Sequence, residues 1–308
     1  MRHLLQLNYV DTVARVGSIR RAAETLAITS TALNRRILAL EDDLGTPIFE
    51  RMPNGVRLNV AGELFIQHVR QQLSDMERVK SQIADLSGVR RGHVSVACGQ
   101  ALMIRFLPAM VSEYRALHPG VSFSVLVAGR QEAAEKLIDY SADIALIYEP
   151  EVSTDIQVLL EMPQQMHALL SADHPLAGND EIRFSEIAQY PLALPSTRAG
   201  IRHVVNRAAN RRNMELKVMI ESDSADFLLS CVEHENMIAF QLPVAFGESG
   251  PRKGVKAIPV CAKDVPCGSL QLCQQKGRNL SVAAARFAAF VTEGLQKSIF
   301  SVESSISA

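Results

Sequence analysis

The stretch from residue 18 to residue 44 constrains the fold of this chain more than any other. Its sequence, SIRRAAETLAITSTALNRRILALEDDL, contains two short amphipathic helical patterns that are joined by a tight turn. Ser18 and Thr29 stand where N-caps belong, and Gly45 stands where a helix would end. Two short helices in this order are typical of a helix-turn-helix, whose second helix enters the major groove of DNA.

The basic residues of the first 60 positions gather around this helix pair. The whole chain of 308 residues has a formal net charge of −1, so composition alone does not indicate a nucleic-acid-binding protein. Arginine pairs with guanine or phosphate, asparagine with adenine, and helix N-termini with phosphate. We therefore predict that DNA is contacted by Ser18, Arg20, Arg21, Thr29, Ser30, Thr31, Asn34, Arg35, Arg36, Arg51 and Arg57.

The segment after Gly45 predicts a hairpin wing followed by a long helix. Asn54-Gly55 is typical of a type I′ turn between two short strands. Residues 61–87 carry apolar side chains at every third or fourth position, which predicts one helix with a narrow apolar seam. The seam could pack within the same chain, but dimerisation is favoured because nothing else in the first 90 residues would cover it. Gly and Arg residues at 88–92 predict a hinge.

From residue 93 onward, strand and helix patterns alternate, which predicts an α/β region large enough for two lobes. Open α/β sheets bind ligands at the carboxyl ends of their strands. The segment PSTRAG opens a helix whose N–H groups could hold a small organic acid, although Ser and Thr at such places are often plain caps. The polar tail at 301–308 is predicted to be disordered. The predicted ligand contacts are Gly99, Gln100, Ala101, Met103, Arg130, Tyr148, Ser196, Thr197, Arg198, Ser222 and Asp223.

Several functional classes find no support in the sequence. There is neither a signal-peptide pattern nor a membrane-length apolar stretch, so we expect a cytoplasmic protein without membrane contact. The five cysteines and eight histidines show no metal-site spacing, and no nucleotide or nucleophile motif is present. We predict no metal, no cofactor and no enzymatic activity. A solute-binding protein or an enzyme built on the α/β half remains the alternative.

Together, these motifs resemble the LysR-type transcriptional regulators. The resemblance rests on GSIRRAAETL, TSTALNRRILALEDDLG, PIFERMPNGVRLNVAG, LPAMVSEYRALHPGVSFSV and SADIALI, and it covers residues 2–300. It implies an N-terminal all-α winged helix-turn-helix, a long linker helix and a two-lobed sensor built like a periplasmic binding protein. The implied ranges are 1–60 for the DNA-binding domain, 61–87 for the linker and dimerisation helix, 88–92 for the hinge, 93–163 and 267–300 for lobe one, and 164–266 for lobe two.

The resemblance also implies a function. Such a regulator binds double-stranded DNA as a homodimer or homotetramer, contacts RNA polymerase, and is switched by a small-molecule effector between the lobes. Three positions depart from the family pattern and are expected to face DNA: Ser30, Asn34 and Asn59 stand where Gln, Ser and Thr are usual. In addition, Gly99-Gln100-Ala101 lacks the Ser or Thr with which many relatives hold a carboxylate.

Overall fold

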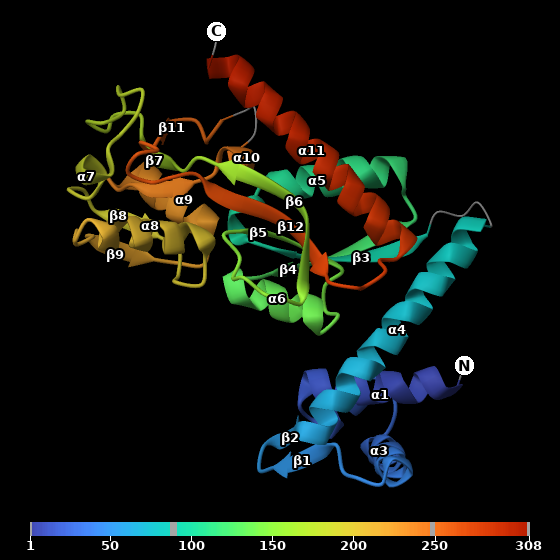
Figure 1. Cartoon of the computed structure of the whole chain (residues 1–308). Coiled ribbons are helices and arrows are strands. Elements are labelled where there is room, and N and C mark those ends of the chain that lie inside the picture. Colours follow the sequence, from blue (N-terminus) through green and yellow to red (C-terminus); the bar gives the residue numbers. More distant parts are fainter. Residues whose placement is uncertain (1, 87–90, 247–249, 307–308) are drawn as a thin grey trace. The chain divides into compact units, whose positions relative to one another are not determined.

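The computed structural model describes residues 2–86, 91–246 and 250–306 (Figure 1). The chain divides into an N-terminal unit, residues 1–83, and a C-terminal unit, residues 84–308. The predicted hinge at 88–92 lies outside the described residues except for its last two positions.

Helices and one hairpin make up the N-terminal unit. Its elements are α1 (Arg2–Val16), α2 (Ile19–Thr25), α3 (Ser30–Leu44), β1 (Phe49–Met52), β2 (Gly55–Leu58) and α4 (Val60–Leu86), which continues past residue 83. The hydroxyl of Ser18 accepts a hydrogen bond from the amide of Arg21 at 3.4 Å, and that of Thr29 accepts one from Ala32 at 3.2 Å. Gly45 ends α3 in the left-handed conformation, with φ of 71°. The predicted caps and the predicted end of the second helix are therefore confirmed.

The core of this unit takes in the first part of α4. Ile66 and Val69 are buried with side chains of α1, α2 and α3, and Leu73 packs against the same cluster. The expectation that nothing else in the first 90 residues would cover the apolar seam is therefore wrong for this part of the helix. Among the described side chains of α4, the large apolar ones left exposed are Val60 (82%), Leu64 (70%), Val79 (38%) and Ile83 (58%).

The hairpin turns one residue earlier than the sequence predicts. Met52 pairs with Gly55, so the two loop residues are Pro53 and Asn54. A type I′ turn needs positive φ at both central residues, whereas the proline at the first of these positions holds φ at about −65°. The predicted type I′ turn at Asn54-Gly55 is therefore wrong. Gly55 has φ of 147°, and a Cβ there would clash with the carbonyl oxygen of Gly17, which also accepts a hydrogen bond from Val56.

Lobe one of the C-terminal unit is built on a five-stranded sheet with the order β4-β3-β5-β12-β6. Val94 and Val96 face a cluster shared with α5 and α11, while Ala97 and Ala145 face α6, as the twofold alternation of a strand requires. Figure 1 shows α5 and α11 on one side of this sheet and α6 on the other. The elements are β3 (Gly92–Cys98), η1 (Gln100–Leu102), α5 (Phe106–Leu117), β4 (Val121–Val127), α6 (Arg130–Ile138), β5 (Ile144–Tyr148), β6 (Ile156–Gln164), β12 (Gly268–Gln275) and α11 (Val282–Ile306).

Lobe two is inserted between β6 and β12. Its sheets have the orders β10-β7-β11 and β8-β9, and a bridge between Leu192 and Ile238 connects them. The chain enters this lobe after Gln164 and returns before Gly268. The elements are β7 (His167–Ser171), α7 (Phe184–Ile187), β8 (Leu192–Leu194), α8 (Gly200–Arg211), β9 (Val218–Glu221), α9 (Ala225–His234), β10 (Ala239–Gln241), α10 (Pro243–Phe246) and β11 (Val255–Pro259).

Three elements differ from expectation. The apolar pattern of residues 101–119 predicts one helix, but the structure splits it into η1 and α5, because Pro108 is tolerated only in the first turn of α5. Strand β6 is absent from the sequence prediction; it is an edge strand, so it accommodates Pro163. Helix α11 continues to Ile306, so residues 301–306, predicted to be disordered, are helical.

Candidate nucleic-acid interface and ligand cleft

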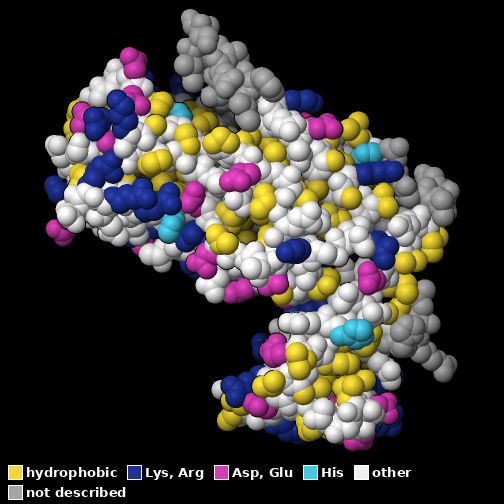
Figure 2. All heavy atoms as spheres, viewed as in Figure 1, with side chains coloured by type: hydrophobic (Ala, Val, Ile, Leu, Met, Phe, Trp, Pro, Cys, Tyr) yellow, Lys and Arg dark blue, Asp and Glu magenta, His cyan; other side chains and the backbone are white. Residues whose placement is uncertain are grey.

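Several predicted DNA contacts lie exposed on the first half of α3. Ser30, Thr31 and Arg35 are exposed, and their side chains have no hydrogen-bond partner among the described residues. Figure 2 shows Lys and Arg side chains along the edge of the N-terminal unit that carries α3 and the hairpin. Polar groups at a helix N-terminus together with a free guanidinium suit a phosphate backbone and base edges.

Arg36 differs from Arg35 because it is held by α1. Its Nη1 donates a hydrogen bond of 2.7 Å to the hydroxyl of Tyr9, and its Cζ lies 4.8 Å from the centre of the Tyr9 ring. A neutral partner orients the guanidinium and leaves its charge intact. Arg36 is thus fixed in direction, whereas Arg35 is not.

The other predicted contacts make short-range interactions within the unit. Arg21 donates to the carbonyl of Val16 at 3.0 Å, and Arg20 pairs with Glu24 at 3.4 Å. On the hairpin, Arg57 pairs with Glu50 at 2.8 Å, while Arg51 is exposed with no partner in the described part of the chain.

Asn59 has a structural role. Its Oδ1 accepts from the amide of Gly62 at 2.8 Å, and its Nδ2 donates to the carbonyl of Pro47 at 2.9 Å. It therefore caps the start of α4, and the expectation that it faces DNA stays a prediction.

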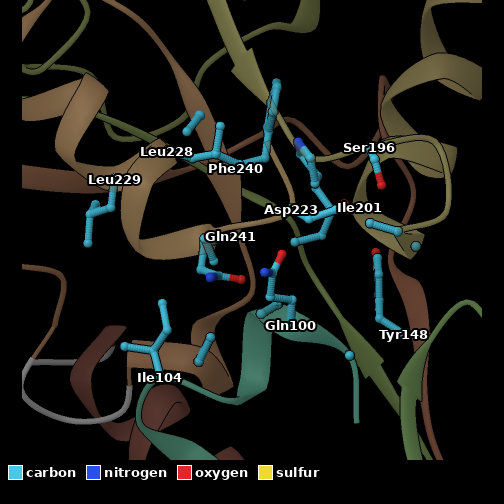
Figure 3. A pocket seen from close by; sticks show the side chains of 18 of the residues that line it. Gln100, Ile104, Tyr148, Ser196, Ile201, Asp223, Leu228, Leu229, Phe240 and Gln241 are labelled. Atoms are coloured by element: carbon cyan, nitrogen blue, oxygen red, sulfur yellow. The ribbon is translucent and has the colours of Figure 1, made fainter. Parts of the chain in front are cut away.

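In the C-terminal unit a cleft opens between the two lobes, with an empty volume of about 1170 Å³ that includes space open to solvent. Most of the predicted ligand contacts line it, namely Gly99, Gln100, Ala101, Arg130, Tyr148, Ser196, Arg198 and Asp223 (Figure 3). Met103, Thr197 and Ser222 are not among its lining residues. Met103 packs against the core, Thr197 is exposed, and the hydroxyl of Ser222 accepts from the amide of Ser224.

Sequence reasoning missed the apolar wall of this cleft. The wall comes from helices as well as strand ends and includes Ile104, Val127, Ile147, Leu169, Ile201, Leu228, Leu229, Phe240 and Phe246. An apolar residue on α9 looks the same in sequence whether it faces a core or a cleft. No local signal could have separated the two.

Arg198 bridges the two lobes beside the cleft. It donates to Glu132 of lobe one at 2.6 Å and to Asp223 of lobe two at 2.6 Å, and its carbonyl accepts from the amide of Arg130 at 3.0 Å. The Gly129 amide, followed by Arg198, lowers the pKa of Glu132. The Ser196 hydroxyl and then Arg198 lower the pKa of Asp223, so both carboxylates are ionised at neutral pH.

Two glycines allow the lobes to meet at this bridge. A Cβ at Gly129 would lie 2.9 Å from the Cβ of Arg198, and one at Gly200 would clash with the carbonyl oxygen of Tyr148. Backbone from one lobe therefore lies directly on backbone of the other.

Within the described residues, no group of three His, Cys, Asp or Glu side chains could hold a metal ion. None of the helices described here is long and apolar enough to cross a membrane.

Two family models match the chain. The model described as "LysR substrate binding domain" matches residues 87–296, and the one described as "Bacterial regulatory helix-turn-helix protein, lysR family" matches residues 4–63. The transcriptional activator CmpR of Synechocystis is 24% identical over 288 residues, covering 92% of this chain and 93% of CmpR. The transcriptional regulator CysB of Burkholderia cenocepacia is 28% identical over 263 residues, covering 84% of this chain and 83% of CysB.

Solved structures share the fold. A full-length OxyR variant of Pseudomonas aeruginosa superposes with a TM-score of 0.72 at 20% identity, covering 94% of each chain. Full-length CbnR in complex with its target DNA gives 0.63 at 17% identity, covering 94% of this chain and 99% of CbnR. The effector-binding domain of QuiR in complex with shikimate gives 0.57 at 19% identity, covering 67% of this chain and 98% of that domain.

Proposed function

The chain belongs to the LysR family of transcriptional regulators, and from that premise we propose how its two units divide the work. It is a DNA-binding transcriptional regulator with an effector-binding domain, not an enzyme. In our proposal the N-terminal unit reads operator DNA through α3, and a small molecule in the cleft of the C-terminal unit changes that activity.

The exposed side chains at the start of α3 support the DNA half of the proposal. Ser30, Thr31 and Arg35 are open to a ligand, and Tyr9 aims Arg36. CbnR, which shares the fold, is described in complex with its target DNA. We propose that the contact set predicted from the sequence meets DNA, with α3 in the major groove and the hairpin on the phosphate backbone.

Assembly is proposed to begin on α4. Leu64 and Val79 are exposed apolar side chains on this helix, and a second copy would cover them. A homodimer formed this way could pair again into a homotetramer. Contact with RNA polymerase and a cytoplasmic location complete the proposal.

The cleft is the proposed effector site because both lobes line it and Arg198 connects them beside it. A ligand shifts the balance between two arrangements only if it binds one of them more tightly. A small organic acid is the sequence-based hypothesis for this ligand, and shikimate in the QuiR domain supports it. The charged side chains in this cleft favour another class of ligand.

The single observation that carries the DNA proposal is the exposed Arg35 at the start of α3, which has no partner among the described residues. The test measures binding to the DNA upstream of the protein's own gene by fluorescence anisotropy over a salt series. The wild-type protein should bind with a steep salt dependence, and Arg35→Ala should lower the slope of log K against log salt by about one. Arg115→Ala replaces an exposed arginine on α5 and is the matched control. It should change neither the binding of DNA nor the slope of log K against log salt. A solute-binding protein or an enzyme would leave this DNA unbound at every salt concentration.

A further inference from the structure

We infer that the cleft takes an uncharged, largely apolar ligand whose polar edge hydrogen-bonds to Gln100 and Gln241, rather than a carboxylate. The inference rests on the proposed function, since it names the class of effector for the same cleft. Four observations carry it: the pairing of the arginines, the charge of Asp223, the apolar wall and the free amide groups of the two glutamines.

Most arginines that line the cleft already have carboxylate partners. The pairs are Arg130 with Glu151 at 3.8 Å, Arg198 with Glu132 and Asp223 at 2.6 Å each, and Arg252 with Asp226 and with Glu233 at 3.4 Å. A ligand carboxylate would have to compete with a carboxylate of the chain at each of these arginines. The displaced group would then lose its partner, so the exchange brings little net gain.

Arg105 is the cleft arginine without a carboxylate partner among the described residues. Its Nη1 donates to the carbonyl oxygens of Gly250 at 2.9 Å and Phe246 at 3.5 Å. Its Nη1 therefore already serves the backbone of lobe two. Because its charge is not neutralised by a described carboxylate, the experiment below includes it as a separate arm.

The end of the cleft beside α8 already holds an ionised carboxylate. A helix N-terminus ordinarily favours an anion. Here the carboxylate of Asp223 lies against Arg198 of the loop that precedes α8, and its lowered pKa keeps it ionised at neutral pH. A second carboxylate at this place would meet a like charge.

The body of the cleft is apolar. Ile104 of lobe one faces Leu228, Leu229 and Phe240 of lobe two, with Ile201 at the start of α8 (Figure 3). A hydrocarbon ring or chain would gain free energy here by removing these side chains from water. A small, strongly hydrated diacid or sugar acid would not.

The polar groups left free in the described part of the cleft are uncharged, and besides the Tyr148 hydroxyl they include two side-chain amides. Gln241 is only 9% exposed, and its Oε1 accepts from the amide of Leu242 at 3.0 Å, which leaves its Nε2 as a donor. The side chain of Gln100 has no hydrogen-bond partner among the described residues. Figure 3 shows the two amide groups pointing toward one another across the pocket. One donor from Gln241 and a donor and an acceptor from Gln100 match an amide, a lactam or a hydroxyl, but cannot neutralise a charge.

The experiment compares matched pairs of probes on the purified full-length protein by isothermal titration calorimetry. The pairs are benzamide with benzoate, and cyclohexanecarboxamide with cyclohexanecarboxylate. Each amide should bind, and each carboxylate should bind at least about tenfold more weakly, since Arg130, Arg198 and Arg252 already have carboxylate partners and do not compensate its desolvation. Gln100→Leu and Gln241→Glu should each weaken amide binding about fivefold, and Gln241→Glu retains the acceptor for Leu242.

The matched control is Gln131→Leu, an exposed glutamine on α6 that is not among the cleft residues, and it should leave amide binding unchanged. Thermal unfolding of each variant checks the fold. The inference is overturned if the carboxylates bind as tightly as the amides, above all if Arg105→Gln abolishes that binding. It is also overturned if neither member of any pair binds, or if amide binding survives both cleft variants. Operator binding by the same samples reports separately on the proposed function.

Discussion

The guanidinium of Arg36 donates a hydrogen bond of 2.7 Å to the hydroxyl of Tyr9 and lies over the Tyr9 ring. Tyr9 is buried in α1, and Arg36 is exposed on α3. One arginine of the proposed reading helix is therefore held from behind by the core of its own unit, while its neighbour Arg35 is free to adapt.

Tyr9→Phe should weaken operator binding through Arg36. The substitution removes one hydrogen bond worth about 1 kcal/mol but retains the ring beneath the guanidinium. We expect a loss of affinity of about fivefold, smaller than that of Arg36→Ala. Fluorescence anisotropy with the single and double variants measures the coupling. If Tyr9→Phe weakens binding as much in the Arg36→Ala background as in the wild type, Tyr9 does not act through Arg36.

Gly200→Ala should push the lobes apart. Its Cβ would clash with the carbonyl oxygen of Tyr148, and such overpacking costs about 1–3 kcal/mol. Differential scanning calorimetry should show a lower melting temperature. Gly178→Ala is the matched control, because nothing lies within 4 Å of its Cβ position. Equal melting temperatures for the two variants would show that the contact between Gly200 and Tyr148 is not tight.

Asp264 should give the C-terminal unit part of its acid sensitivity. Its buried carboxylate accepts from Arg183 at 2.6 and 2.8 Å, from the amide of Phe184 at 3.0 Å and from Arg212 at 3.1 Å. Arg183 above all lowers its pKa from 3.8 to about 2. A carboxylate whose pKa is lower in the folded than in the unfolded state stabilises the protein at pH values above its unfolded-state pKa. This stabilisation, here about 2 kcal/mol, is lost as the pH falls from about 4 to about 2.

Asp264→Asn should therefore lower stability at neutral pH and flatten the acid-unfolding curve over that range. Urea unfolding at a series of pH values measures both effects. Arg183→Gln should reproduce part of the flattening, because it removes the main cause of the pKa shift. An unchanged pH dependence in Asp264→Asn would contradict the assignment.

Leu64→Glu should dissociate the proposed dimer. Leu64 is 70% exposed on α4, and a carboxylate buried in an apolar interface would lack a partner. Sedimentation velocity should show a shift toward monomer and anisotropy a weaker complex with operator DNA. Gln67→Glu, which adds the same charge at an exposed polar position of α4, serves as the comparison. A Leu64→Glu protein that remains as associated as Gln67→Glu would place the interface elsewhere.

Local chemistry determined much of this protein. Ser18, Thr29 and Gly45 fix the ends of α2 and α3 through bonds that span only three or four residues, so the helix-turn-helix could be read directly. Alternating apolar residues placed most strands of the C-terminal unit, and the residues that follow those strands include Gln100, Tyr148 and Ser196 of the cleft. These features depend on near neighbours, which the sequence displays.

Tertiary structure decided what depends on distant neighbours. Whether Ile66 meets its own core or a second copy depends on how α4 folds back, and the Nδ2 of Asn59 finds its acceptor only because the carbonyl of Pro47, 12 residues earlier, lies beside it. The charge of the cleft was hidden for the same reason. Arg198 reads as a free cation in sequence, yet Glu132, 66 residues earlier, and Asp223, 25 residues later, neutralise it. A pairing between residues so far apart leaves no local pattern, and it is this pairing that turns the expected acid site into one better suited to a neutral ligand.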